Sequence, residues 1–259
     1  MTAPLCRDGL PLAVHRAGSG PLALVQHGLG GDAGQVAALW PDSLPATRLT
    51  LDCRGHGGSP KGLGGWGFAQ FAADLEALLA REARAPLVLG GVSMGAALAL
   101  RLAVADPGRV RGLILLRPAW GVGPVAPNMA PVAEAARLLL AGQRFEDSSL
   151  ARDMAASPDN LASLRGYFSR PDAAEFAPVL AALAADDPGL TGAQIAALDL
   201  PALVLCAPRD LIHPAALAED LSRRLPRATL APLPDKAADP QAHRQAAARA
   251  IAQFLAQLD

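Results

Sequence analysis

The sequence predicts an α/β fold, in which a mostly parallel, doubly wound sheet is covered by helices on both faces. Two observations lead to this prediction. Short apolar runs alternate with longer helical segments over most of the chain, and one stretch in the middle breaks the alternation. Continuous apolar runs are typical of strands that are buried on both faces of a parallel sheet. Strands that alternate with helices favour the doubly wound arrangement.

The expected elements follow one another in a regular order. The last helix has a clear start signal, because Asp239 and Pro240 form a good pair for the N-cap and the first helical position. We expect strands at residues 22–26, 48–52, 87–89, 112–116, 202–206 and 229–233, and helices at residues 68–83, 96–105, 214–225 and from 240 to the C-terminus.

Residues 118–198 break the alternation. They contain no good strand, and they are too long for a loop. They offer short helical pieces at 131–141, with Gly142 as a C-cap, and then at 160–169 and 172–185. Such an insertion would sit over the strand ends as a helical lid. The sequence therefore predicts a core made of residues 1–117 and 199–259, with a lid at 118–198.

Composition narrows the range of partners. Of the 259 residues, 51% are hydrophobic and 18% are charged, so a sizeable core can be buried. The net charge is −1, and no basic run suggests nucleic acid or a membrane surface. No apolar stretch reaches the roughly 18 residues of a membrane span, and the first residues lack a signal-peptide pattern. Three cysteines, far apart and odd in number, argue against disulfides and a zinc site. We expect a cytoplasmic protein without metal or cofactor that acts on a small molecule.

The most informative motif is the run of residues 91–95, GVSMG, which matches G-x-S-x-G. An apolar strand-like stretch precedes it and a helix-like stretch follows it. A serine on a sharp strand-to-helix turn has its hydroxyl exposed, and small flanking residues permit the strained turn. The N–H groups of the following helix point toward an anion formed there. The motif therefore predicts a nucleophile, Ser93, beside half of an oxyanion hole.

Several further motifs stand in a familiar order around this serine. Residues 27–31 read HGLGG after the first expected strand, and residues 52–59 read DCRGHGGS after the second. Asp210 follows the penultimate expected strand. With these motifs, the chain resembles the α/β-hydrolase superfamily over nearly its whole length. The resemblance implies that Asp210 is the acid of a Ser–Asp–His triad. It also implies that Asp52 is structural and ties down the turn that follows it.

The oxyanion donors would be two backbone N–H groups, those of Leu29 and Met94. The glycines around Leu29 would let the backbone approach a substrate closely. We also expect His27, Trp120 and His213 to line the substrate site. Trp120 could equally be a packing residue between the lid and the core.

Several residues are candidates for the base, because the place where the family has its histidine, residues 233–239, contains none. We expect His243, in the first turn of the last helix, to be the base that reaches Ser93. His213 is a second candidate, although it stands only three positions after its own orienting acid. Lys236, which occupies the approximate place of the missing histidine, could also serve as a base. It is also open whether the chain has a catalytic histidine at all.

These residues predict a serine hydrolase that cleaves a small or medium apolar ester, or a related carbonyl substrate, through an acyl-enzyme. Two further classes of function stay open. One is a superfamily member that does not hydrolyse esters, namely a carbon–carbon bond hydrolase, a lyase or a cofactor-free oxygenase. The second is a ligand-binding protein that lacks a working histidine. The sequence predicts no oligomeric state.

Overall fold

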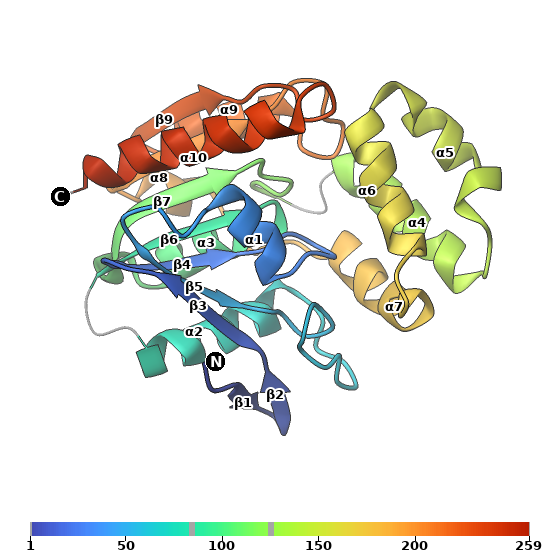
Figure 1. The fold of residues 1–259 in the computed structure, drawn as a ribbon, viewed down its shortest axis with the longest axis horizontal. Helices are drawn as coiled ribbons and strands as arrows, with labels where there is room; N and C mark the ends of the chain where they lie inside the picture. The colour runs from blue at the N-terminus through green and yellow to red at the C-terminus, as the bar shows by residue number, and fades with distance from the viewer. Residues whose placement is uncertain (1, 83–85, 124–126, 259) are drawn as a thin grey trace.

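A seven-stranded sheet forms the centre of the computed structural model, which describes residues 2–82, 86–123 and 127–258 (Figure 1). The strand order is β3-β5-β4-β6-β7-β8-β9, and every neighbouring pair is parallel except β3 and β5. The bounds are β3 Val14–Gly18, β4 Leu22–Gln26, β5 Thr47–Leu51, β6 Leu87–Val92, β7 Val110–Leu116, β8 Pro201–Cys206 and β9 Arg227–Pro232.

The six predicted strands are confirmed, one of them with the same bounds and the others with ends that differ by up to three residues. Three N-terminal strands were not predicted. Of these, β1 (Leu5–Arg7) and β2 (Leu10–Leu12) pair as a separate antiparallel hairpin. The third, β3, lies at the edge of the main sheet and leaves most of its side chains at least partly exposed. Such strands lack the continuous apolar run by which the central strands are recognised.

Helices cover both faces of the sheet, and successive residues of one strand face opposite layers. In β4, Leu24 packs into one hydrophobic cluster, whereas Ala23 and Val25 pack into the other. One face is covered by α1 (Ala33–Leu39) and α10 (Pro240–Ala256). The other face is covered by α2 (Phe68–Glu82), α3 (Met94–Ala105) and α9 (Ala215–Arg224). The predicted α/β class is therefore confirmed, while Ala83, the expected end of the first long helix, lies outside the described residues.

Between β7 and β8 the described residues form helices and no strand. Four of the helices gather beside the sheet in Figure 1, and we call residues 127–184 the lid. They are α4 (Ala130–Leu140), α5 (Ser149–Asp153), α6 (Pro158–Phe168) and α7 (Ala173–Ala184), while α8 (Gly192–Ala196) contacts α3 and α9. Short 3₁₀ turns are η1 (Pro107–Arg109), η2 (Pro127–Met129), η3 (Phe145–Asp147) and η4 (Met154–Ala156).

A glycine ends helix α4. Gly142 has φ +64°, and the N–H groups of Gly142 and Gln143 donate to the carbonyls of Leu139 and Leu138. This is the Schellman arrangement that glycine favours, so the predicted C-cap is confirmed.

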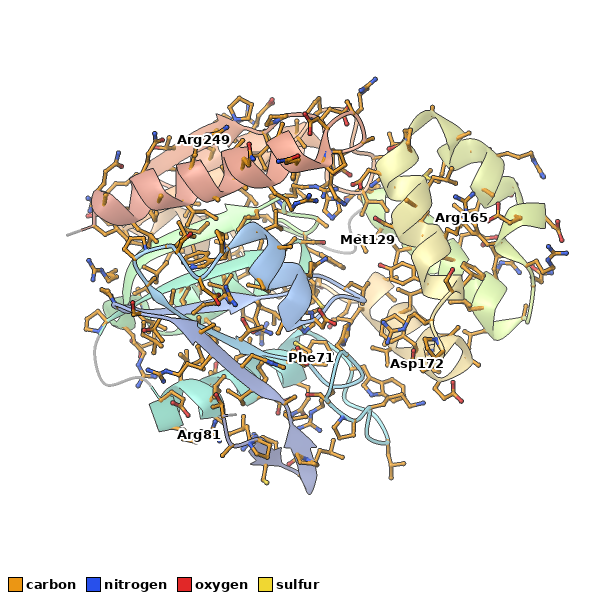
Figure 2. All side chains as sticks on the ribbon, in the orientation of Figure 1. Phe71, Arg81, Met129, Arg165, Asp172 and Arg249 are labelled. Atoms are coloured by element: carbon orange, nitrogen blue, oxygen red, sulfur yellow. The ribbon has the colours of Figure 1, made fainter. Side chains whose placement is uncertain are left out.

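Side chains fill the space between lid and sheet, with Met129, only 1% exposed, at their boundary (Figure 2). None of the described helices has the length and hydropathy that crossing a bilayer requires.

Because α3 packs closely against β4, we predict that one added methyl group at Gly95 lowers the stability of the fold. A Cβ at Gly95 would lie 2.3 Å from the Gln26 carbonyl oxygen and 2.8 Å from that of His27. We therefore expect Gly95→Ala to lower the free energy of unfolding by about 1–3 kcal/mol, because backbone must shift. Gly166→Ala is the matched control, since nothing lies within 4 Å of its Cβ position. The control should be neutral or stabilise α6 by up to ~1 kcal/mol. Urea denaturation measures both, and equal effects would contradict the prediction.

Candidate active site

Ser93 lies on a strained turn between β6 and α3. Its φ is 55° and its ψ is −109°, a conformation that residues with a side chain rarely adopt. The turn is possible because glycines stand on either side: a Cβ on Gly91 would lie 2.2 Å from the carbonyl carbon of Gly95. The Ser93 N–H donates to the Leu116 carbonyl at 2.9 Å, which fixes the turn against β7. The predicted position of Ser93 at the start of a helix is confirmed.

The side chain that meets Ser93 is His213. The distance from His213 Nε2 to Ser93 Oγ is 3.0 Å, and His213 Nδ1 lies 2.9 Å from Asp210 Oδ1. The backbone N–H of His213 donates to the same carboxylate oxygen at 2.9 Å. Both residues stand in the loop between β8 and α9, and both are largely buried. The structure therefore aligns serine, imidazole and carboxylate in one chain of hydrogen bonds.

This arrangement corrects the expectation that His243 reaches Ser93. His243 does lie in the first turn of α10, and Asp239 caps that helix as predicted. Its ring, however, is buried, and its Nδ1 donates to the Pro234 carbonyl at 2.8 Å, so it holds the preceding loop. The nearness of His213 to Asp210 in the chain is no obstacle. A spacing of three residues lets the backbone N–H and the ring of His213 reach one carboxylate.

Asp210 has partners from three parts of the chain. Arg117, at the end of β7, donates to Asp210 Oδ2 from Nε at 2.9 Å and from Nη2 at 2.5 Å. Asn160 of the lid donates from Nδ2 to Oδ1 at 2.8 Å. Burial raises the pKa of Asp210, but His213, Arg117 and Asn160 together hold it well below its usual range. Asp210 is therefore a carboxylate at every ordinary pH.

The environment also keeps the His213 ring neutral. Burial and the charge of Arg117 lower the pKa of His213 below its usual value, although Asp210 acts in the opposite direction. Sequence reasoning did not identify Arg117 or Asn160 as partners of the acid. Arg117 has φ +45° and lies directly after a strand, which places it at the same sheet edge as Ser93 and Asp210. Asn160 lies 50 residues from Asp210 in the chain, and no local pattern connects the two.

The loop after β4 lies against the Ser93 turn. A Cβ on Gly28 would be 3.4 Å from Ser93 Cβ, and the Gly28 N–H donates to Gln35 Oε1 at 2.7 Å. Within the described residues, the N–H groups of Leu29 and Met94 donate to no protein acceptor. Their role as oxyanion donors stays a prediction.

His27 is a structural residue and does not line a substrate site. It has no exposed surface, and both ring nitrogens are bonded to backbone. Its Nδ1 donates to the Gly28 carbonyl at 2.8 Å, while Nε2 accepts the Cys53 N–H at 3.0 Å. Burial lowers the pKa of His27, so the neutral ring connects two loops through its hydrogen bonds.

Trp120 also differs from its expected role on the substrate wall. Its ring is 1% exposed, packs edge-on against Phe68 and donates from Nε1 to the Asp186 carbonyl at 3.2 Å. Trp120 therefore packs between core helix α2 and the end of the inserted segment, which is the alternative that the sequence left open. Lys236 is partly exposed and its Nζ lies 2.5 Å from Asp159 Oδ1, so it is an ion-pair partner and not a buried base.

Asp52 has the structural role that the resemblance implied. Its Oδ1 accepts the Ala33 N–H at 2.9 Å, and its Oδ2 accepts the Gly58 N–H at 2.9 Å. His15 Nε2 lies 3.0 Å from the same Oδ2. Asp52 therefore joins the turn of residues 52–59 to the start of α1, and takes no part in the Ser93 cluster.

Comparisons with known proteins show which family the chain resembles. The model of the family described as serine aminopeptidase, S33, matches residues 22–236. A lipase of Mycobacterium tuberculosis (Lipase LipV) is 34% identical over 146 residues, 55% of this chain and 53% of that protein. A 2-(acetamidomethylene)succinate hydrolase of Mesorhizobium japonicum is 32% identical over 139 residues, 53% of this chain and 49% of that protein. The chain spans about half the length of the curated relatives it matches.

A solved structure extends the likeness over the full fold. The enol-lactonase of Burkholderia xenovorans LB400 aligns with a TM-score of 0.72 at 25% identity, covering 98% of this chain and 99% of that chain. The fold of this chain is therefore shared with a known hydrolase over almost its whole length.

The cluster predicts how His213 titrates. Its pKa should lie below the usual value of about 6.5, because burial and Arg117 disfavour the charged ring. Asp210→Asn should lower that pKa further, since it removes the carboxylate that favours the imidazolium. Histidine NMR titration, with His213→Asn to assign the signal, measures both values. Asp153→Asn removes a charge at an exposed lid position and serves as the control. An unchanged or higher pKa in Asp210→Asn would contradict the prediction.

Proposed function

Because the chain belongs to the serine aminopeptidase S33 family of α/β-hydrolases, we propose that it is a serine hydrolase that cleaves a small or medium ester or related carbonyl substrate through an acyl-enzyme on Ser93. The observation that carries this proposal is the chain of hydrogen bonds from Ser93 through His213 to Asp210. Serine is inert at its free pKa and needs a base within hydrogen-bond reach, and 3.0 Å satisfies that need.

In the proposed reaction, Ser93 Oγ attacks the substrate carbonyl while His213 Nε2 takes the serine proton. Asp210 accepts the Nδ1–H of His213, which keeps Nε2 free as the acceptor and stabilises the imidazolium that forms. The N–H groups of Leu29 and Met94 would hold the oxyanion. His213 then gives its proton to the leaving group, and the acyl-enzyme forms. Water, deprotonated by His213, releases the acid and restores Ser93.

The charge of Arg117 suits His213 to the role of a base. Burial and the charge of Arg117 together lower the pKa of His213, so the ring stays neutral, and able to accept the serine proton, down to a more acidic pH. The same charge makes the imidazolium less stable once it forms, so proton return to the leaving group is favoured.

The names of similar proteins support an ester or a related carbonyl substrate. They include a lipase and an enol-lactonase, and also a 2-(acetamidomethylene)succinate hydrolase. The hypothesis of a ligand-binding protein rested on a missing histidine, and His213 beside Ser93 removes that reason. A carbon–carbon bond hydrolase, a lyase or a cofactor-free oxygenase would use the same side chains, but no contact among the described residues favours one.

We also propose a small-molecule substrate and a cytoplasmic location. Cys6, Cys53 and Cys206 are free thiols, which suits a reducing compartment.

Burial raises the pKa of the Cys53 and Cys206 thiols, so these residues are unreactive packing groups beside the site.

Hydrolysis of p-nitrophenyl butyrate tests the proposal and the choice of histidine together. Ser93→Ala should abolish turnover, and His213→Ala should lower kcat by about 10³-fold or more, because the serine loses its base. A fluorophosphonate should label Ser93 in the wild type.

His243→Gln is the informative comparison. It retains a side-chain donor near the Pro234 carbonyl, and its kcat should stay within about tenfold of the wild type, as expected for a residue outside the chemistry. A loss in His243→Gln as large as that in His213→Ala would contradict the assignment. Wild-type protein that neither turns over esters nor reacts at Ser93 would contradict the proposed function.

A further inference from the structure

Helix α6 lies on the side of the lid that faces the core, and its two ends contact the two loops of the proposed catalytic machinery (Figure 1). Near its N-terminus, Asn160 Nδ2 donates to Asp210 Oδ1 at 2.8 Å. Near its C-terminus, the Tyr167 hydroxyl donates to the Leu29 carbonyl at 3.3 Å. A single rigid element therefore touches both the acid and the loop of the expected oxyanion donor.

The amide of Asn160 can adopt only one orientation. Its side chain has no exposed surface. Oδ1 accepts the Leu211 N–H at 2.7 Å and the Ser157 hydroxyl at 2.7 Å, so Nδ2 is the atom that faces Asp210. The Ser157 hydroxyl also lies 2.9 Å from the Arg209 carbonyl, and its single proton can be donated to either oxygen, so the Leu211 N–H is the donor that fixes the amide orientation. The amide thus binds the Asp210 loop at its backbone and at its carboxylate.

An ion-pair cluster holds this end of α6 on the core. Asp159 Oδ2 accepts from Arg117 Nη2 at 2.6 Å, and Asp159 Oδ1 lies 2.5 Å from Lys236 Nζ. Arg117 in turn binds Asp210. Lys236 stands where the family usually has its histidine, so here that position anchors the lid. The charged groups around Asn160 are therefore Asp210, Arg117, Asp159 and Lys236, and the titratable but neutral His213 ring lies beside them.

The other end of α6 is equally close to the core. A Cβ on Gly30, which has φ +75°, would lie 2.5 Å from Tyr167 Cε1, so the ring rests directly on the loop backbone. Arg170, just beyond α6, donates from Nη1 to the Gly30 carbonyl at 3.2 Å and stacks over Phe176 with 4.0 Å to the ring centroid. These contacts restrain the loop that carries the Leu29 N–H.

We propose that α6 is a brace for the catalytic machinery and that Asn160, a lid residue, is the positioning residue for the acid, Asp210. This inference rests on the proposed function. It means that one of the hydrogen bonds that orient the acid, the bond from Asn160, is present only while the lid is docked, whereas the bonds from Arg117 and His213 come from the core. If the lid moved away, Asp210 would lose the hydrogen bond from Asn160, and the Leu29 loop would at the same time lose its contact with Tyr167.

Asn160→Asp tests the donor with almost no change of shape. The variant keeps an oxygen for the Leu211 N–H and the Ser157 hydroxyl, but places a carboxylate against Asp210 when both groups are ionised. At pH 8 we expect kcat on p-nitrophenyl butyrate to fall by about tenfold or more, with KM within about twofold. As pH falls, a proton shared by the two carboxylates restores a donor, so the ratio of variant to wild-type kcat should rise.

Ser163→Asp is the matched control, since it adds the same charge on an exposed position of the same helix and should leave kcat at every pH as in the wild type. Thermal melting checks that each variant is folded. If Asn160→Asp does not fold, Asn160→Ala replaces it. The expected result for Asn160→Ala is a fall in kcat with unchanged KM, matched by an equal fall in the rate of fluorophosphonate labelling at Ser93.

The outcomes separate the inference from the function on which it rests. Wild-type turnover and labelling, together with a folded Asn160→Asp that has normal kcat or a deficit that does not change with pH, would overturn the brace and keep the hydrolase. An Asn160→Ala variant whose KM changes while kcat does not would also overturn the brace. Wild-type protein without turnover or labelling would overturn both.

Discussion

The carboxylate of Asp210 is the point on which the site depends. It accepts hydrogen bonds from its own loop through His213, from the end of β7 through Arg117, and from the lid through Asn160. A buried carboxylate is costly unless it is paired and fully hydrogen-bonded. The hydrogen bonds to this one carboxylate therefore hold three separate segments of the chain together. As a consequence, the His213 ring points toward Ser93.

The Ser93 turn adds a second constraint, which is steric. The left-handed backbone at Ser93 is unfavourable on its own and persists because the surrounding strands and helix determine it. Gly91 and Gly95 allow β6, α3 and β4 to approach more closely than any side chain would permit. The strained turn and the buried charge lie together at one edge of the sheet, which is where parallel strands place their functional loops.

The lid contributes more than a cover. Apolar side chains such as Met129 seal it to the core, but its polar contacts are concentrated on the loops that carry Asp210 and Leu29. Asp159 links Arg117 with Lys236, so the position from which the family histidine is absent has become part of the lid attachment.

The sequence by itself determined the α/β fold, the six central strands and the positions of Ser93 and Asp210 after their strands. These features follow from local patterns: apolar runs, glycine-flanked turns and motif order along the chain. It did not determine which histidine meets Ser93, that His27 and Trp120 pack inward, or that Arg117 and Asn160 hold the acid. Those contacts join residues far apart in the chain, or depend on the direction in which a ring turns within a loop. Only the tertiary structure decides them, because burial must satisfy every polar group at once and local sequence carries no record of the partner.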